Sequence, residues 1–492
     1  MIKIFMLNPP YVAGFCRSAR WAAKSRGRVQ RHPDGMLIAA AVLERAGFEV
    51  TFVDGAALNL TQAQVAARLK DTRPQLTVLH TTTPSIYNDL TYAAQAKEDS
   101  GGITVLIGPH VTALPGETIL MGHPGVDFIA RGEYDETLLE MAEALAGTET
   151  TTRDEVLDRL RQIPGLTYLD ADRRVVHSPD RPPLDVNWLP FPAWHHIRPE
   201  WYQDAGKRFP FLTLISGRGC HGRCTFCRDV KLMEGRKLRM RRPDLVVDEM
   251  VSDLQQFPNL KEIMFETDTF TAIGSHVTGV CQEILRRGLK ITWSCNARVD
   301  MDVKLMPLMK RAGCRMLMVG FEFGTQEALD AVKKGTTLEQ ARRFAQAAKR
   351  AGLIIHGCFM IGAPGETRES ALKTIEFARS LPMDTVQFSG ICTYPGTEMY
   401  DWAKQQGYLI PQDWTEWVGP DCEQVTLLSY PQLSKPEIDQ LIDLGLKRFY
   451  LRPTQMIKML AAIRSFEDLK RKLFGLKGFA DYFTGKSGRN HG

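Results

Sequence analysis

The sequence lacks the features of membrane-spanning and secreted proteins. It holds no apolar run near the roughly 18 residues needed to cross a bilayer. Its first nine residues have the pattern of a strand, and they lack the charged start and the cleavage site of a signal peptide. The net charge of +5 is too small to indicate nucleic-acid binding by itself. We therefore expect a cytoplasmic protein without a nucleic-acid partner.

Cysteine is sparse and unevenly distributed over the 492 residues. Seven of the ten cysteines are scattered, several of them in apolar runs of strand type: Cys16, Cys281, Cys295, Cys314, Cys358, Cys392 and Cys422. That pattern is typical of buried free thiols in a reducing compartment. The contents of 44% hydrophobic and 24% charged residues are those of a globular protein, and the length allows about three domains.

The other three cysteines have the spacing C-x3-C-x2-C in a glycine-rich loop, residues 216–227, that follows an apolar run of strand type. Three thiolates close together can hold a four-iron cluster and leave one iron open to a further ligand. Zinc usually takes four ligands in paired C-x2-C units, and the sequence has no second pair. Three buried core cysteines are the other alternative. We expect Cys220, Cys224 and Cys227 to bind a catalytic 4Fe-4S cluster.

Residues 1–147 alternate strand and helix patterns, which predicts a doubly wound α/β domain. The predicted strands are residues 3–7, 49–53, 76–80, 104–107 and 127–130. Ligands of such sheets bind beyond the carboxyl ends of the strands. Those ends carry small, hydroxyl-bearing and glycine residues, which suit a large cofactor with a polar edge. A domain of this kind that binds nothing is the alternative.

The rest of the chain divides into three parts by composition. Residues 148–205 have the proline-rich composition of a linker with one short hairpin. Residues 206–400 show six strand–helix repeats, which predict a partial (β/α)6 barrel with its chemistry at the carboxyl ends of the strands. Residues 401–492 form a helical C-terminal region whose patterns cover 435–450 and 454–472. The second pattern is basic, and it can lie on an anionic membrane or cap the barrel.

Polar residues follow the strands of the predicted barrel at one rim. Glu266 and Asp268 follow the second strand, Arg298 the third and Glu322 the fourth. Arg298 and Glu322 offer the one cation and one anion that a zwitterionic amino acid needs close by. The alternative is that Arg298 and Glu322 have the role of a buried structural ion pair. Aromatic residues near the same rim suit a bulky, apolar substrate, although they can equally pack in the core: Phe270, Phe321, Phe323 and Tyr394.

The cysteine loop and the rim residues resemble the radical S-adenosylmethionine (radical SAM) enzymes, and the likeness covers nearly the whole chain. The resemblance implies that the open iron binds S-adenosylmethionine (SAM), whose cleavage gives a 5′-deoxyadenosyl radical. It implies that Glu266 and Asp268 line the SAM or substrate pocket, and that Arg298 and Glu322 contact SAM. Relatives often have two aspartates where Glu266 and Thr267 stand.

The first domain resembles the cobalamin-binding domain that precedes many radical SAM enzymes. The resemblance rests on the loops Gly108-Pro109-His110 and Arg131-Gly132-Glu133. It implies a cobalamin-binding set of Thr81, Thr82, Thr83, Gly108, Pro109, His110, Gly132 and Glu133. The motif D-x-H-x-x-G, whose histidine ligates cobalt in other proteins, is absent. The basic segment 17–32, with six Lys or Arg and no acidic residue, is either a solvated loop or a contact for an anionic substrate or the cofactor.

The predicted function is C-methylation of an unactivated carbon in a bulky, largely apolar small molecule by a cobalamin-dependent radical SAM enzyme. The cofactors are then a 4Fe-4S cluster, SAM and cobalamin. The partners are a lipid, tetrapyrrole or natural-product substrate and an external electron donor such as flavodoxin or ferredoxin. The sequence does not decide whether the protein also contacts the inner face of a membrane. The alternatives are a radical oxidative cyclase, like the anaerobic magnesium-protoporphyrin ester cyclase, and a non-catalytic binding protein that responds to cobalamin or redox state.

Overall fold

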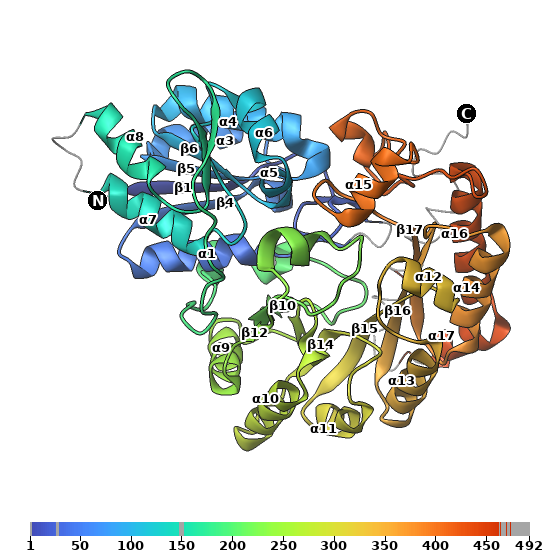
Figure 1. The fold of residues 1–492 in the computed structure, drawn as a ribbon. Helices are drawn as coiled ribbons and strands as arrows, with labels where there is room; N and C mark the ends of the chain where they lie inside the picture. Colours follow the sequence, from blue (N-terminus) through green and yellow to red (C-terminus); the bar gives the residue numbers. More distant parts are fainter. Residues whose placement is uncertain are drawn as a thin grey trace. The chain divides into compact units, whose positions relative to one another are not determined.

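The computed structural model describes residues 2–25, 29–146 and 152–461, together with residues 463, 469 and 473. The chain forms two compact units (Figure 1). Unit 1 comprises Met1–Tyr202, Arg228–Gly235 and Gln412–Gln424. Unit 2 comprises Gln203–Cys227, Arg236–Pro411 and Val425–Gly492. Among the described residues, no helix has the length and apolar character needed to cross a membrane.

Unit 1 is built on a seven-stranded sheet in the order β4-β1-β5-β6-β7-β8-β9. The first five strands in this order pair in parallel, and β8 and β9 form an antiparallel hairpin on the β7 edge. The strand order reverses between β1 and β5, and doubly wound folds bind ligands at such a point. The strands are β1 Lys3–Asn8, β4 Glu49–Asp54, β5 Leu76–His80, β6 Ile103–Ile107, β7 Phe128–Ala130, β8 Leu166–Leu169 and β9 Val175–His177.

Helices cover both faces of this sheet. Phe5, Leu79 and Leu106 point from the strands into an apolar core that α3, α4, α5 and α6 complete, while α1 and α7 pack together on the other face (Figure 1). Helix α1 ends before Gly47, whose φ of +87° fits the residue after a helix. The helices are α1 Asp34–Arg45, α2 Gly55–Leu58, α3 Gln62–Thr72, α4 Ile86–Ser100, α5 Pro109–Ala113, α6 Pro115–Gly122, α7 Asp135–Leu145 and α8 Arg153–Arg161.

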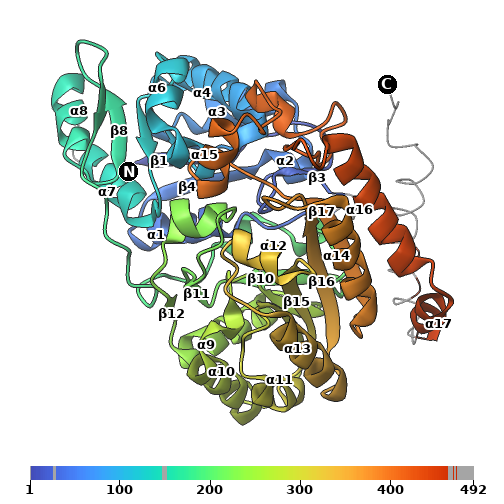
Figure 2. The ribbon, with the colours of Figure 1, turned by 45° about the vertical axis from the view of Figure 1, so that its right-hand side comes forward.

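Unit 2 is built on six parallel strands that pair in sequence order, as an open barrel requires (Figure 2). Helices pack on one face. On β16, Ile355 and Phe359 are buried, whereas the alternating His356 and Cys358 are partly exposed on the face without helices. The strands are β10 Phe211–Leu214, β13 Glu262–Phe265, β14 Thr292–Ala297, β15 Cys314–Glu322, β16 Ile354–Ile361 and β17 Thr385–Gly390.

Two of the longer helices of unit 2 begin at capping boxes. Thr337 and Gln340 form a capping box at the start of α13, and Ser434 and Glu437 form one at α16. The helices are α9 Pro243–Gln256, α10 Gly274–Arg286, α11 Met306–Arg311, α12 Gln326–Ala331, α13 Leu338–Arg350, α14 Arg368–Ser380, α15 Glu398–Gln405, α16 Lys435–Tyr450 and α17 Pro453–Ala461. Two-residue ladders join β2 Phe15–Cys16 to β3 Ala23–Lys24, and β11 Gly217–Arg218 to β12 Arg239–Met240.

The predicted fold class is confirmed, and the differences lie at element ends. The hairpin expected inside the linker pairs with β7, so the compact unit continues to Tyr202. The predicted division of the chain at residues 147, 205 and 400 stays a prediction. The expected helix 454–472 corresponds to α17 in its first part, and most of its remainder lies outside the described residues.

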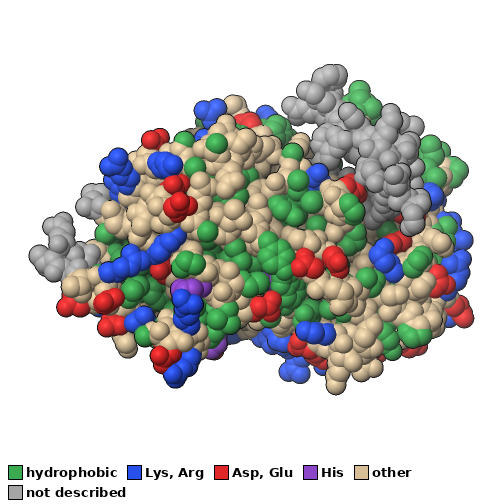
Figure 3. All heavy atoms as spheres, turned by 90° about the horizontal axis from the view of Figure 1, so that it is seen from above, with side chains coloured by type: hydrophobic (Ala, Val, Ile, Leu, Met, Phe, Trp, Pro, Cys, Tyr) green, Lys and Arg blue, Asp and Glu red, His purple; other side chains and the backbone are tan. Residues whose placement is uncertain are grey.

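On the face shown in Figure 3, Lys and Arg side chains are interspersed with acidic and uncharged ones.

Candidate active site

The cysteine loop follows β10, and hydrogen bonds hold both of its ends. Ser216 N donates to Thr267 Oγ1 at 2.8 Å, which ties the start of the loop to the strand end of β13. Thr225 N donates to Val332 O at 3.1 Å, and Met399 N donates to Thr225 O at 3.0 Å. The loop therefore has a fixed shape, because three separate elements of unit 2 hold its backbone.

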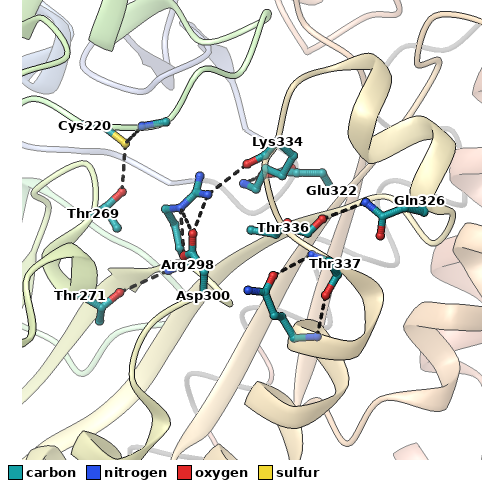
Figure 4. Close-up of polar contacts among 12 residues, drawn as sticks. Cys220, Thr269, Thr271, Arg298, Asp300, Glu322, Gln326, Lys334, Thr336 and Thr337 are labelled. Carbon is teal, nitrogen blue, oxygen red and sulfur yellow. Dashed lines mark hydrogen bonds and ion pairs between the residues drawn. The ribbon is translucent and has the colours of Figure 1, made fainter.

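The loop directs two of its sulfur atoms to one place. A Cβ at Gly222 would lie 3.3 Å from Cys220 Sγ and 3.9 Å from Cys224 Sγ, so glycine keeps the space in front of both thiols open. Gly222 N donates to Cys220 Sγ at 3.4 Å, and Thr269 Oγ1 lies 3.5 Å from the same sulfur (Figure 4). None of the ten cysteines forms a disulfide among the described residues. These residues fit an iron–sulfur cluster, because the three cysteines of one loop are not consumed by disulfides and a side chain at position 222 would fill the space in front of Cys220 and Cys224.

Arg298 lies beside this loop with its guanidinium buried. Its Nη2 donates to Asp300 Oδ2 at 2.9 Å and to Lys334 O at 3.0 Å (Figure 4). The position of the Gly222 Cβ would be 3.2 Å from Arg298 Nη1, so the cation is next to the cysteine loop. Burial alone would lower the pKa of Arg298, but Asp300 and the thiolates of Cys224 and Cys220 raise it. The site thus holds a permanent cation close to the thiols.

Glu322 is the last residue of β15, and it is held in an unusual conformation. Its φ is +65°, at a register shift between β15 and β16, a backbone state that costs about 1–3 kcal/mol for a residue with a side chain. Glu322 Oε1 accepts a hydrogen bond from Lys334 Nζ at 2.7 Å, and both side chains are buried. A Cβ on Gly320 would overlap this carboxylate oxygen. Strain of this kind, fixed by a buried ion pair, is typical of functional sites.

Lys334 contacts both charged residues of the rim, Glu322 and Arg298. Its ammonium binds Glu322, and its carbonyl accepts from Arg298. Burial alone would lower the pKa of Lys334, but the charge of Glu322 and then of the Cys224 thiolate raises it, so the lysine stays protonated. Arg298 and Glu322 therefore do not pair with each other, because each has its own partner of opposite charge.

The residues at positions 266–268, which follow β13 at the rim, have different environments. Thr267 is buried against Ser216, with the two hydroxyl oxygens 3.0 Å apart. Asn296 Nδ2 donates to the carbonyls of Glu266 and Thr267 at 3.3 and 3.2 Å. Glu266 and Asp268 are half-buried, and Asp268 Oδ2 is a buried atom. Thr267 therefore serves the cysteine loop, and Glu266 and Asp268 flank it on the same segment.

A further carboxyl group is buried in the loop after β16. Glu366 Oε2 accepts from Gly362 N at 2.5 Å and from Ala363 N at 3.1 Å. Burial outweighs these two hydrogen bonds and raises the pKa of Glu366 to about 7. Tyr430 OH donates to Gly362 O at 2.7 Å and closes the same loop. The loop shape therefore depends on a carboxyl group that titrates near neutral pH.

In unit 1, the threonine run after β5 is held by a buried ion pair. Arg17 Nη2 is 2.7 Å from Asp89 Oδ2, and the same oxygen accepts from Thr82 N at 3.2 Å and Ser85 Oγ at 2.7 Å. Thr81 Oγ1 donates to Ile107 O at 2.9 Å. Arg17 is the first arginine of the basic segment 17–32, and it is buried against the loop that it supports. At Arg17 the segment is therefore neither a solvated loop nor a ligand contact.

His110 offers a buried polar atom beside this run. Its Nδ1 lies 3.2 Å from Thr83 Oγ1, while Nε2 has no hydrogen-bond partner among the described residues. Burial lowers the pKa of His110 to about 3, and the neutral ring lies edge-on to Trp414 at 5.3 Å. Gly108 has a φ of +115°, and a Cβ there would lie 2.7 Å from Thr81 O. These residues fit a cofactor with polar edges, since an unsatisfied buried nitrogen needs a partner.

The other predicted cobalamin residues lie at the ends of neighbouring strands. Pro109 begins α5, and Gly132 N donates to Thr112 Oγ1 at 3.0 Å. Glu133 accepts from Leu184 N at 3.2 Å, so its carboxylate is partly used inside the protein. The turn Val230–Glu234 (η4), which follows the cysteine loop in the chain, contacts α5 in this unit.

The aromatic residues expected at the rim are in the core. Phe270 stacks on Phe265 with ring centroids 4.5 Å apart, and Phe321 stacks on Phe359 at 5.4 Å. Phe323 and Tyr394 are also buried. Their packing explains their apolar character, so they carry no information about a substrate.

Sequence reasoning missed Lys334 and the part that Asp300 plays. Lys334 lies between two helices, twelve residues after Glu322, in a polar run with no distinctive spacing. Asp300 follows Arg298 by two residues, which was the one available signal for their contact.

The comparisons with known proteins agree with this arrangement. The model of the radical SAM superfamily matches residues 214–378, and that of the B12 binding domain matches residues 25–142. An uncharacterized methyltransferase of Pyrococcus horikoshii is 31% identical over 480 residues, which are 97% of this chain and 98% of that protein. The anaerobic magnesium-protoporphyrin IX monomethyl ester cyclase of Rubrivivax gelatinosus is 27% identical over 409 residues, 81% of this chain and 69% of that protein.

Among solved structures, the radical SAM methyltransferase TsrM from Kitasatospora setae, with cobalamin and a [4Fe-4S] cluster bound, has a similar fold. The TM-score is 0.71 at 16% identity, covering 98% of this chain and 100% of that chain. Fold, thiol loop and relatives together define a radical SAM enzyme with a B12-binding domain. The chain belongs to the cobalamin-dependent radical SAM family, and the relatives confirm the prediction of an enzyme of the methyltransferase type.

Proposed function

We propose that this enzyme C-methylates an unactivated carbon of a small-molecule substrate through a 5′-deoxyadenosyl radical. The observation that supports the SAM site best is the pair of buried, separately neutralised charges beside the cysteine loop. Arg298 and Glu322 offer one cation and one anion, as the amino and carboxylate groups of SAM require. Each charge is fixed by its own partner, so neither needs to reorganise when SAM binds.

In this proposal Cys220, Cys224 and Cys227 hold the cluster. The bound cluster supplies the electron that cleaves SAM, and cobalamin carries methyl groups. Arg298 orients the SAM carboxylate, while Glu322 binds the SAM amino group through the carboxylate oxygen that Lys334 does not occupy. Glu266 and Asp268, which are partly exposed, line the SAM or substrate side of the rim.

Cobalamin binds, in the same proposal, over the loops that follow β5, β6 and β7. The Nε2 of the neutral His110, which has no hydrogen-bond partner among the described residues, would be available to hydrogen-bond a polar group of the cofactor. The binding set is Thr81, Thr82, Thr83, Gly108, Pro109, His110, Gly132 and Glu133. A ring nitrogen with a pKa of about 3 is a neutral donor or acceptor, and Trp414 covers one edge of the ring.

The test is the stoichiometry of products from SAM. Methyl transfer gives S-adenosylhomocysteine and 5′-deoxyadenosine in about equal amounts for each turnover. The second candidate function is ring formation, which the likeness to the Rubrivivax gelatinosus cyclase favours. Ring formation gives 5′-deoxyadenosine without S-adenosylhomocysteine. Substrate-dependent turnover that yields 5′-deoxyadenosine alone would replace methylation by cyclisation.

The partners belong to this proposal as well. An external donor such as flavodoxin or ferredoxin supplies the electron, and the substrate is a lipid, tetrapyrrole or natural product. The C-terminal region contacts an anionic membrane through exposed apolar residues, Leu451, Met456 and Ile457. Lys458 is 3.0 Å from Asp384 and Arg448 is 2.9 Å from Glu376, which supports a capping role for the start of this region.

A further inference from the structure

Unit 1 carries three metal-ligating side chains on elements that take no part in the cobalamin loops. Glu44 lies in the last turn of α1, and His195 and His196 lie in the helical turn Trp194–His196 (η2). Glu44 Oε1 is 3.0 Å from His195 Nε2 and 2.7 Å from His196 Nε2. The three donor atoms lie within 4.8 Å of one another.

The backbone and neighbouring side chains fix this group before any ion binds. Ala193 N donates to Leu37 O at 3.0 Å, and Trp194 is buried, so the turn is held against α1. The two imidazole rings lie 4.2 Å apart and direct their Nε2 atoms at one carboxylate oxygen. The exposed fractions of the His195 and Glu44 side chains are 57% and 26%, which leaves an approach from solvent.

Two imidazoles and one carboxylate are the protein donors of zinc sites that keep a position open for water. Zinc bonds of about 2.0–2.2 Å in a tetrahedron separate neighbouring donors by about 3.3 Å. The separations of 3.0 and 2.7 Å from Glu44 Oε1 would therefore widen by about 0.3 and 0.6 Å, which partly exposed side chains allow by small rotations.

We propose that Glu44, His195 and His196 bind one divalent transition-metal ion of the zinc type, with water completing its coordination, and that this ion fastens the turn at residues 194–196 to α1. The site shares no residue with the cluster cysteines or with the predicted cobalamin-binding set, since its ligands are the carboxylate of Glu44 and the imidazoles of His195 and His196. The simpler arrangement, in which both imidazoles donate to Glu44 and no ion binds, is the outcome against which the proposal is tested.

The experiment is equilibrium dialysis of the full chain, without a polyhistidine tag and with its cluster reconstituted, against micromolar Zn²⁺. Bound zinc is then counted per chain by elemental analysis. We expect one zinc in the wild type and none in His195→Gln or Glu44→Gln. His195 is largely exposed, so His195→Gln leaves the fold intact. The matched control is His177→Gln, an exposed histidine on β9, which should keep the zinc.

Cys224→Ser separates this site from the thiols, because zinc held by Glu44 and the histidines stays bound in that variant. Zinc should also raise the thermal unfolding midpoint of the wild type and not that of His195→Gln, as expected for an ion that binds the native state. Equal zinc in the wild type and His195→Gln would overturn the proposal. So would zinc that disappears in Cys224→Ser, or wild-type saturation that requires millimolar zinc.

Discussion

Replacing Lys334 by methionine is the most informative single perturbation of the SAM site. The change keeps most of the apolar stem and removes the ammonium group that lies 2.7 Å from Glu322 Oε1. Both side chains are buried, with exposed fractions of 7% and 11%. Removing one partner of a buried pair leaves an uncompensated charge and costs about 3–5 kcal/mol. We therefore expect the free energy of unfolding to fall by about 3 kcal/mol, together with loss of SAM cleavage.

Lys333→Met is the matched control, because it removes the same charge from the adjacent residue. Lys333 pairs with Glu398 at the surface, where the exposed fractions are 54% and 51%. An exposed pair contributes about 0–1 kcal/mol, so this variant should unfold close to the wild type and cleave SAM at the wild-type rate. Denaturant unfolding of the cluster-free proteins measures stability, and 5′-deoxyadenosine released by dithionite-reduced, cluster-loaded protein measures cleavage.

A double variant separates the stability effect from the functional one. Lys334→Met with Glu322→Gln removes both charges, so most of the lost stability should return. SAM cleavage should stay absent, since the anion for the SAM amino group is gone. The reasoning is wrong if Lys334→Met and Lys333→Met are equally stable, or if the double variant cleaves SAM like the wild type.

Four further predictions follow from the same geometry. Cys224→Ala should lose most of the iron and all SAM cleavage, measured by iron assay and product analysis, and wild-type iron would contradict the cluster assignment. Reconstituted protein should show the absorption of base-off cobalamin, and His110→Phe should weaken cobalamin retention in gel filtration; unchanged retention would remove His110 from the site. The raised pKa of Glu366 means that the folded state holds a proton that the unfolded state releases between about pH 4.5 and 7, so its contribution to stability is lost as pH rises through this window. Glu366→Gln should flatten this decline in the free energy of unfolding with pH, measured by denaturation at several pH values. An unchanged profile would mean that Glu366 does not titrate in this pH range. Anionic liposomes should sediment the protein in a salt-sensitive way, and equal binding to neutral vesicles would leave the C-terminal region its capping role alone.

The regular elements could be read from the sequence because local signals and burial agree there. The spacing of Ala341, Phe344, Ala345 and Ala348, with the Thr337 cap, predicts 338–350, the observed range of α13. The hairpin of β8 and β9 was also evident, but its pairing was not. A hairpin pattern does not say which sheet edge it joins, and here the exposed edge of β7 accepts it.

The structure places the predicted rim residues after neighbouring strands, as expected for a parallel sheet, but the sequence did not indicate which side chains pair with one another. Strand order predicts that Arg298 and Glu322 share a rim, because the carboxyl ends of parallel strands face one way. It cannot predict that Lys334, from the connection after α12, supplies the partner of Glu322. The sequence also left open whether Phe321 lines the rim or packs in the core. Side chains alternate along a strand, and this one faces the helix layer near Phe344.

The fate of the SAM methyl group tests the central claim most directly. Cluster- and cobalamin-loaded protein is incubated anaerobically with a reductant, host extract and SAM that carries a trideuterated methyl group. The account predicts a small molecule in which one hydrogen on carbon has been replaced by an intact trideuteromethyl group, with S-adenosylhomocysteine and 5′-deoxyadenosine formed together. Extract-dependent release of 5′-deoxyadenosine without labelled product or S-adenosylhomocysteine would contradict methyl transfer.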